Sequence, residues 1–284
     1  MKVLITGAAG VLGKAVTALV EQEGGYDLRL SDTVPVETPH EFVAADLAQS
    51  EEVKPLCDGV EQVLHIAGIH PWKSYTPEQY LDCNIKGTCN LLQAATDAGV
   101  KRVIYTSSIA AMGYIPDGPE QLPMDETKPC RPLENLYGVS KHVGEQFCQM
   151  FWHNDGLDYL ALRPACFIPC DEREPGFGLG LLGSRIQLSD VAQAHLLALK
   201  SEAKNQPIII ATRTPFAEAD GPALYSDARS VILKHFPEAI ALEAAGIELP
   251  EQIHTTYNIA RAEQVLGYRP QLNFEQWLEG WLSR

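Results

Sequence analysis

The sequence predicts an α/β fold built on a doubly wound parallel sheet of about seven strands. Short apolar runs rich in β-branched residues alternate along the chain with amphipathic stretches. Such runs are typical of strands buried on both faces, and their alternation with helices predicts right-handed crossovers and parallel pairing. The predicted strands are Val3–Thr6, Leu28–Ser31, Glu41–Ala44, Gln62–Ile66, Arg102–Ser107, Tyr159–Leu162 and Ile208–Thr212.

Capping residues mark where the helices between these strands begin. The segment Thr76-Pro77-Glu78-Gln79 combines an N-cap, a proline at the first helical position and a capping glutamine. It predicts a long helix that runs to about Ala98 and ends at Gly99. Further helices are expected to begin at Ser189-Asp190, Ser226-Asp227 and Asn273-Phe274-Glu275-Gln276.

The regular alternation of strands and helices ends after Arg163-Pro164. We expect residues 1–165 to form the main α/β domain and residues 166–284 to form a small C-terminal lobe. A strand at about 207–212 is expected to return to the main sheet. The segment Pro169–Ser184 is rich in glycine, proline and charge, which predicts a mobile loop or lid.

Charge and hydropathy exclude two classes of protein. The chain has 22 basic and 37 acidic residues, and its formal net charge of −15 repels the phosphate backbone of nucleic acids. No apolar run approaches the length of about eighteen residues that a transmembrane helix needs. The segment Met1–Gly7 reaches a glycine before an export signal develops. We therefore expect a protein that binds neither nucleic acid nor membrane.

The cysteines indicate a reducing compartment. The seven thiols are scattered along the chain without the C-x-x-C spacing of a zinc site. Unpaired thiols of this kind are typical of intracellular proteins. We expect a cytoplasmic protein without a bound metal.

A glycine-rich turn follows the first strand and leads directly into a helical pattern, with the sequence Thr6-Gly7-Ala8-Ala9-Gly10-Val11-Leu12-Gly13. Gly7 permits a tight turn, Gly10 lets the backbone approach a pyrophosphate, and Gly13 allows close packing of helix and strand. The helix amides then favour phosphate charge. We expect a dinucleotide to contact Gly7, Gly10, Val11, Leu12 and Gly13; the alternative is a purely structural turn.

Two carboxylates follow the second and third strands. Asp32 can accept hydrogen bonds from an adenosine ribose, and it would repel a 2′-phosphate. Because residues 33–40 supply no Lys or Arg to bind that phosphate, NAD is favoured over NADP. Asp46 can accept from the adenine amino group. An ordinary strand-end aspartate is the alternative for Asp32, and helix capping is the alternative for Asp46.

The segment Tyr137-Gly138-Val139-Ser140-Lys141 places a phenol and an ammonium group on one face of a predicted helix. A nearby cation favours the phenolate, as does an oxidised nicotinamide ring, so both lower the tyrosine pKa. Tyr137 is therefore the predicted general base toward a substrate hydroxyl, with Lys141 also holding the nicotinamide ribose. A hydroxyl of Thr106-Ser107-Ser108, at the end of the fifth strand, can orient the substrate oxygen.

Together these segments resemble the extended short-chain dehydrogenase/reductases, the family of NAD-dependent sugar epimerases and dehydratases. The resemblance spans nearly the whole chain and implies a Rossmann-type sheet with a small C-terminal lobe that binds substrate. Besides the turn and the tyrosine segment, it is carried by Asp46-Leu47, His65-Ile66-Ala67-Gly68, Asn84-Ile85-Lys86-Gly87-Thr88, Thr106-Ser107-Ser108, Arg163-Pro164, Asp190-Val191-Ala192 and Leu266-Gly267-Tyr268-Arg269-Pro270.

The resemblance also implies individual roles. Ser108 matches the catalytic serine, with Ser107 as the near alternative, Tyr137 matches the base and Lys141 its partner. Capping or packing is the alternative for Asn84, and a structural histidine is the alternative for His65. Further cofactor contacts are implied for Leu47, Ile66, Ala67, Gly68 and Asn84. Candidates for the substrate pocket are His70, Trp72, Met112, Tyr114, Cys166 and Phe167.

Two features choose among the reactions of this family. Sugar 4,6-dehydratases carry an acidic pair where this chain has Ile109-Ala110-Ala111-Met112, so elimination lacks its proton carriers. Nucleotide-sugar epimerases build a larger C-terminal lobe than the short stretch between Arg163 and Asp190 allows. That compact lobe and Gly68-Ile69 are similar to the uronate dehydrogenase branch, although no arginine here is identified as the ligand of a substrate carboxylate.

We expect an NAD-dependent dehydrogenase that oxidises a secondary hydroxyl of a sugar or sugar acid, with a small carbohydrate as its partner. The alternatives are an NAD-dependent nucleotide-sugar epimerase and a non-catalytic NAD-sensing protein. Arg173, Arg185 and Arg213 are the cations available for a substrate diphosphate. The resemblance also implies a homodimer that pairs the long helices carrying Asn84 and Tyr137.

Overall fold

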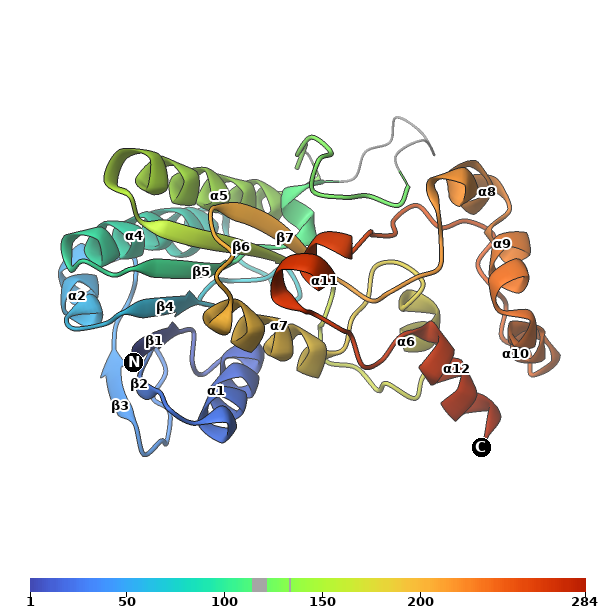
Figure 1. Ribbon diagram of the computed structural model, residues 1–284, viewed down its shortest axis with the longest axis horizontal. Helices are drawn as coiled ribbons and strands as arrows, with labels where there is room; N and C mark the ends of the chain where they lie inside the picture. Colours follow the sequence, from blue (N-terminus) through green and yellow to red (C-terminus); the bar gives the residue numbers. More distant parts are fainter. Residues whose placement is uncertain (114–121, 133) are drawn as a thin grey trace.

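Seven parallel strands form one sheet in the order β3-β2-β1-β4-β5-β6-β7 (Figure 1). The computed structural model describes residues 1–113, 122–132 and 134–284. The predicted doubly wound α/β fold, with its seven strands, is confirmed. The strands are β1 (Lys2–Thr6), β2 (Asp27–Asp32), β3 (Glu41–Ala44), β4 (Gln62–His65), β5 (Arg102–Thr106), β6 (Asp158–Pro164) and β7 (Gln206–Ile210).

The strand register brings the carboxyl ends of the central strands to one edge of the sheet. Thr6 at the end of β1 is opposite both Ser31 of β2 and His65 of β4. The strand order reverses direction between β1 and β4. In open α/β sheets the crevice outside this reversal is where ligands bind.

Helices cover both faces of the sheet, and each face has its own apolar core (Figure 1). On one face lie α1 (Val11–Glu23) and α7 (Leu188–Lys200), and on the other lie α2 (Ser50–Val53), α4 (Gly87–Asp97) and α5 (Leu136–Asp155). The inner strands are buried on both sides, which explains why they appear in the sequence as continuous apolar runs, whereas the edge strand β3 is only partly buried. Short 3-10 helices occur at Lys54–Cys57, Ile109–Ala111, Glu218–Asp220 and Pro237–Ala239.

The long helix predicted from Thr76 is confirmed. The Thr76 side chain accepts from the Gln79 amide, and the Gln79 side chain accepts from the Thr76 amide, which completes a capping box before α3 (Pro77–Tyr80). A π-helical turn, Leu81–Lys86, joins α3 to α4. Such turns insert an extra residue and are frequent at functional sites.

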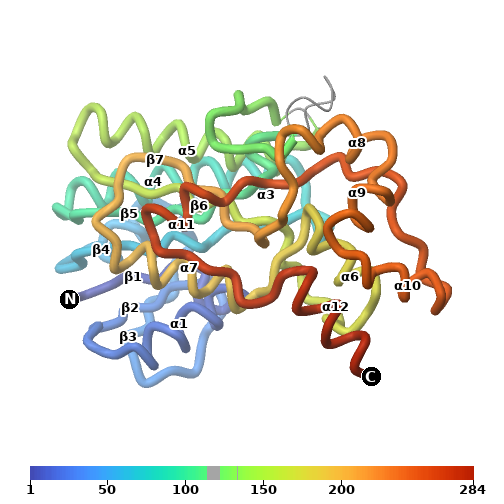
Figure 2. The backbone as a smooth tube through the Cα atoms, turned by 45° about the vertical axis from the view of Figure 1, so that its right-hand side comes forward, coloured from blue at the N-terminus to red at the C-terminus, as the bar shows by residue number. Residues whose placement is uncertain are grey.

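The chain after residue 165 contributes α7 and one strand to the main α/β domain, and much of the rest forms a lobe of short helices. The returning strand is β7, which pairs with β6, as predicted. The helices are α6 (Pro175–Gly180), α8 (Gly221–Ser226), α9 (Ala228–His235), α10 (Ile240–Ala244), α11 (Ala260–Leu266) and α12 (Phe274–Leu282). Figure 2 shows α8, α9, α10 and α12 grouped beyond the end of the sheet. The domain boundary at residue 165 stays a prediction.

The segment Pro169–Ser184 is not a loop throughout, which corrects the prediction made from its composition. Pro175 occupies the first turn of α6, and Phe177 is buried. Gly178 packs so closely on the Trp277 ring of α12 that a Cβ there would lie 2.1 Å from it. Packing on α12 therefore overrides the turn signals of the glycines.

None of the helices in the described part of the chain combines the length and the apolar surface that crossing a membrane would require.

Candidate active site

A cavity of about 530 Å³ opens at the carboxyl edge of the sheet, beside the reversal of strand order. Its wall contains nearly every residue that the sequence assigned to a cofactor. These are Gly7, Gly10, Val11, Leu12, Gly13, Asp32, Asp46, Leu47, Ile66, Ala67, Gly68, Tyr137 and Lys141. Residues far apart in the chain are thus brought to one site.

The glycine turn has the geometry that the sequence predicted. Gly7 has a φ of 73°, and a Cβ on it would lie 2.6 Å from the Ala67 amide nitrogen. A Cβ on Gly13 would lie 2.1 Å from the Gly7 carbonyl oxygen. Gly10 is the N-cap of α1, and no side chain caps this helix. The backbone N–H groups of the first turn are therefore free to bind a pyrophosphate at the positive end of the helix, which lines the cavity.

Asp32 joins the end of β2 to the glycine turn. Its carboxylate accepts from the backbone amides of Ala9 at 2.9 Å and Val34 at 3.1 Å, and it is only partly buried. Lone pairs remain for a ribose diol, because a carboxylate has about four acceptor positions. Asp46 accepts from the Ala48 amide at 2.9 Å and lines the cavity, whereas the helix that follows begins after Gln49, so Asp46 does not have the helix-capping role that was its alternative.

Asn84 and His65 lie behind the cavity wall. The Asn84 side chain accepts from the Ile69 amide at 2.8 Å and donates to the Ser140 hydroxyl at 3.0 Å, and Asn84 is not among the residues that line the cavity. His65 is fully buried and hydrogen-bonded to the hydroxyls of Thr6 and Thr88. His65 therefore has the structural role that was its alternative, whereas Asn84 positions the Ile69 segment and its contact with the cofactor stays a prediction.

Tyr137 and Lys141 lie one turn apart near the start of α5, which Asn135 caps by accepting from the Gly138 amide. Tyr137 is only 8% exposed, and it lies close enough to Ser108 for the serine to lower the pKa of Tyr137. Lys141 donates to the Thr106 carbonyl oxygen at 2.8 Å, and its Nζ lies 5.9 Å from the Tyr137 ring centroid. The predicted serine, tyrosine and lysine are therefore adjacent.

Burial opposes the charged forms of both α5 groups. It raises the pKa of Tyr137 to about 12, although Ser108 acts in the opposite direction. It lowers the pKa of Lys141 to about 8. The expected lowering of the tyrosine pKa is thus not found in the chain alone, because desolvation outweighs the opposing effect of Ser108.

The neighbouring serine, Ser107, is engaged elsewhere. Its hydroxyl donates to Glu145 Oε1 at 2.5 Å, and Glu145 also accepts two hydrogen bonds from Arg163. All three side chains are buried. This contact leaves Ser108 as the hydroxyl available to a substrate. The sequence analysis missed Glu145, which could have been found because it follows Lys141 by one turn on the same helix face.

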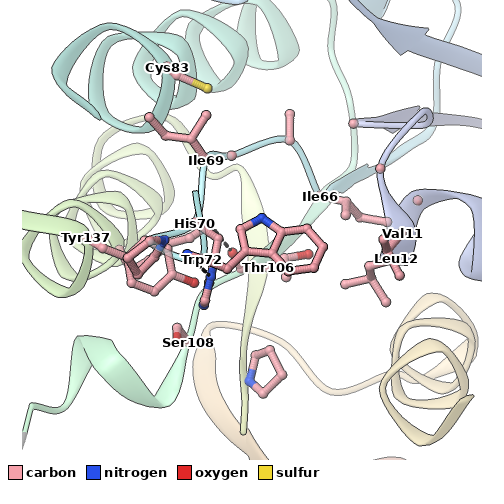
Figure 3. A pocket seen from close by; sticks show the side chains of 18 of the residues that line it. Val11, Leu12, Ile66, Ile69, His70, Trp72, Cys83, Thr106, Ser108 and Tyr137 are labelled. Atoms are coloured by element: carbon pink, nitrogen blue, oxygen red, sulfur yellow. Dashed lines mark hydrogen bonds between the residues drawn. The ribbon is translucent and has the colours of Figure 1, made fainter. Parts of the chain in front are cut away.

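The predicted substrate residues His70, Cys166 and Phe167 also line the cavity, as does Trp72. Figure 3 shows His70, Tyr137 and Ser108 together in the cavity. The prediction that Met112 belongs to the substrate pocket is wrong. Met112 follows the 3-10 turn Ile109–Ala111, is fully buried in the apolar core and does not line the cavity. Tyr114 lies outside the described residues.

Fold and cavity together define a class, the dinucleotide-binding α/β proteins with a tyrosine and lysine at the cofactor end of the site. The comparison with known families agrees. Residues 3–168 match the sequence model of the NAD dependent epimerase/dehydratase family, and the chain belongs to this family. The predicted family is confirmed. NAD, the predicted cofactor, is part of the name of this family.

Known proteins similar to this chain include two kinds of sugar enzyme. Uronate dehydrogenase of Pseudomonas putida is 34% identical over 174 residues, which cover 59% of this chain and 62% of that protein. UDP-glucose 4-epimerase of Lactobacillus helveticus is 33% identical over 174 residues, covering 57% and 51%. The matched region thus spans about three-fifths or less of these relatives.

Solved structures support the fold over the whole chain. A variant of uronate dehydrogenase from Agrobacterium tumefaciens, in complex with NAD, superposes with a TM-score of 0.71 at 22% identity. The superposition covers 99% of this chain and 89% of that one.

Proposed function

We propose that this protein is an NAD-dependent dehydrogenase that oxidises a secondary hydroxyl of a sugar or sugar acid. The observation that carries the proposal is the contact between Tyr137 and Ser108 inside the cavity, with Lys141 one turn away. The similarity to uronate dehydrogenase supports it. A phenol and a hydroxyl that can both hydrogen-bond to one substrate hydroxyl are suited to removing the proton of that hydroxyl.

The cavity fits NAD through residues of this chain. The uncapped start of α1 would hold the pyrophosphate, Asp32 the adenosine ribose, and Lys141 the nicotinamide ribose. When bound, NAD supplies a positively charged ring that accepts a hydride. Its remaining contacts would come from Ile66, Ala67 and Gly68, which line the wall beside the glycine turn.

The chain's own contribution is to orient the substrate and take its proton. Ser108 donates to the substrate oxygen and fixes it beside the Tyr137 hydroxyl. Tyr137, as phenolate, then accepts the hydroxyl proton. The Lys141 ammonium group stabilises that phenolate, and its bond to the Thr106 carbonyl oxygen keeps it in place. A bound nicotinamide ring would add to this stabilisation and would oppose the desolvation that raises the pKa of Tyr137.

The second candidate is an NAD-dependent nucleotide-sugar epimerase, which the similarity to UDP-glucose 4-epimerase supports. The two functions differ in what happens to NAD. A dehydrogenase releases NADH with every turnover, whereas an epimerase returns the hydride and shows no net change in cofactor. A non-catalytic NAD-sensing protein would bind NAD and turn over no substrate.

The test uses the purified protein with NAD and a panel of free sugar acids, neutral sugars and UDP-sugars. We expect NADH to accumulate in amounts well above the enzyme concentration with a free sugar or sugar acid. Epimerisation of a UDP-sugar without NADH accumulation would favour the second candidate. NAD binding without turnover of any compound would favour the sensor.

We further propose a cytoplasmic homodimer. All seven cysteines are free thiols, which supports a reducing compartment. Two apolar side chains on one face of α5, Val139 and Met150, are 36% and 42% exposed and would be covered by a second copy. Light scattering should show particles of about twice the 31.2 kDa chain mass. Particles of the single-chain mass at micromolar concentration would contradict the dimer.

A further inference from the structure

The segment from Ile69 to Lys73 forms one wall of the cavity and is held in a defined turn. Asn84 binds the Ile69 backbone through its amide and carbonyl groups. The Lys73 amide donates to the His70 carbonyl oxygen at 3.3 Å. The Trp72 amide donates to His70 Nδ1 at 3.2 Å. The turn therefore presents its side chains from a fixed backbone.

His70 is held as a neutral donor beside Tyr137. Since its Nδ1 accepts from the Trp72 amide, the ring proton lies on Nε2. Burial and the Lys141 ammonium group lower the pKa of His70, so the neutral ring is favoured. The two rings meet edge to face, with centroids 4.8 Å apart. Nε2–H is thus available to a ligand close to the predicted base.

Trp72 presents a large aromatic surface to the cavity without being covered by the protein. It is 46% exposed and lines the cavity, and Figure 3 shows its indole ring within the site. An indole left open in a pocket is a platform for a flat apolar face, such as the C–H face of a pyranose.

Lys73 places a positive charge next to this platform. Its Nζ lies 5.9 Å from the Trp72 ring centroid. No carboxylate of the described residues lies within ion-pair distance of it, whereas many other lysines of the described chain are paired, for example Lys101 with Glu61. An unpaired cation in a pocket wall favours an anionic ligand.

The charges along the cavity are separated by sign. Among the described residues that line the cavity, the carboxylates are Asp32 and Asp46 and the cationic side chains are Lys73 and Lys141. The carboxylates follow β2 and β3, and the lysines lie beside β4 and β5. The end that holds the reacting groups is therefore positive, in a chain whose net charge is −15.

The three arginines that the sequence offers for a substrate diphosphate provide no equivalent cation in the cavity. Arg173 forms a bidentate pair with Asp171, and Arg213 is paired with Glu263. Arg185 donates to Cys170 Sγ at 3.3 Å. None of the three lines the cavity.

We propose that Trp72 and Lys73 form a subsite that selects a monosaccharide carrying an anionic group, with the sugar ring against the indole and the anion on the Lys73 ammonium. This inference rests on the proposed dehydrogenase function. The anion is a carboxylate or a phosphate, and the test distinguishes them. Lys73 acts as a specificity-determining residue, because it contacts a part of the substrate that does not react.

The test compares kcat/KM for free uronates, for sugar 6-phosphates and for the corresponding neutral aldoses, with NAD, in five proteins. These are the wild type, Lys73→Met, Lys73→Arg, Arg173→Met in the lobe, and the control Lys101→Met, whose exposed side chain lies at the opposite edge of the sheet. We expect Lys73→Met to lower kcat/KM for the anionic sugar about 10- to 100-fold, chiefly through KM. Lys73→Arg should retain most of the activity, and the control should behave as wild type.

The anionic sugar that depends on Lys73 identifies the group, uronate or sugar phosphate. NAD affinity, measured by tryptophan fluorescence or calorimetry, should stay within about threefold. The subsite is overturned, with the dehydrogenase intact, if Lys73→Met oxidises anionic sugars as well as wild type or if Arg173→Met causes the loss instead. A loss confined to NAD affinity would also overturn it. If the wild type oxidises no sugar at all, the proposed function fails too.

Discussion

The Ser107 hydroxyl donates a 2.5 Å hydrogen bond to the buried Glu145 carboxylate, one residue before the serine that contacts Tyr137. Two adjacent hydroxyls at the end of β5 thus have different partners. Ser107 joins the end of β5 to Glu145 of α5, and Glu145 also forms a buried ion pair with Arg163. Ser108 remains in contact with the predicted base. This division gives the two serines different expected phenotypes.

Ser108→Ala should lower kcat by about 100- to 1,000-fold and shift the pH profile of oxidation to higher pH. The shift is expected because Ser108 lowers the pKa of Tyr137, and activity rises with pH as the phenolate forms. Ser107→Ala should instead reduce the free energy of unfolding by about 1–3 kcal/mol, since a buried carboxylate oxygen loses a donor. Steady-state kinetics and urea denaturation of both variants separate these effects. The reverse assignment would contradict the role of Ser108.

Asp32→Ala should lower kcat/KM for NAD by about 10-fold or more and raise the relative use of NADP. The carboxylate would no longer accept from the ribose or repel a 2′-phosphate. Kinetics with both cofactors measure the ratio. Asp27→Ala, at the exposed other end of β2, is the matched control. An unchanged preference for NAD in Asp32→Ala would show that another group selects the cofactor.

Two buried histidines should make the fold sensitive to acid. Burial lowers the pKa of His65 to about 3 and of His195 to about 4. As the pH falls from 6.5 toward 4, the unfolded chain therefore binds protons that the folded chain does not. Each histidine then reduces the free energy of unfolding by up to about 1.4 kcal/mol per pH unit.

Urea denaturation between pH 6.5 and 4.5 measures this slope. In His195→Gln the number of protons taken up on unfolding, which sets this slope, should fall by close to one. Loss of the contact with Thr106 also lowers stability at every pH. A variant with the wild-type slope would show that His195 does not cause the acid sensitivity.

The sequence predicted the sheet well because most strands are buried apolar runs with a turn signal after them, although the edge strand β3 is only partly buried. The run at Glu41–Ala44 is bounded as predicted, and the others differ by one or two residues at their ends. The lobe was harder, since its short helices depend on tertiary packing. At Gly178, contact with Trp277 stabilises a helix where glycines indicated a loop.

The candidate site was predictable where the chemistry calls for particular residue types at a fixed spacing. The glycine turn after the first strand and the pair Tyr137 and Lys141 are such cases. Partners distant in sequence were not predictable: nothing local shows that Asn84 binds Ile69 behind the wall. Nor does the sequence show that burial raises the Tyr137 pKa, because desolvation is a property of the folded cavity.

The central claim is that Tyr137 takes the proton of the substrate hydroxyl. It is tested most directly by comparing sugar oxidation in wild type and Tyr137→Phe, with NAD binding measured in parallel and Tyr26→Phe, at the other edge of the sheet, as control. We predict that Tyr137→Phe lowers kcat by about 1,000-fold while its dissociation constant for NAD stays within about threefold of wild type. A Tyr137→Phe protein that reduces NAD at the wild-type rate would contradict the account.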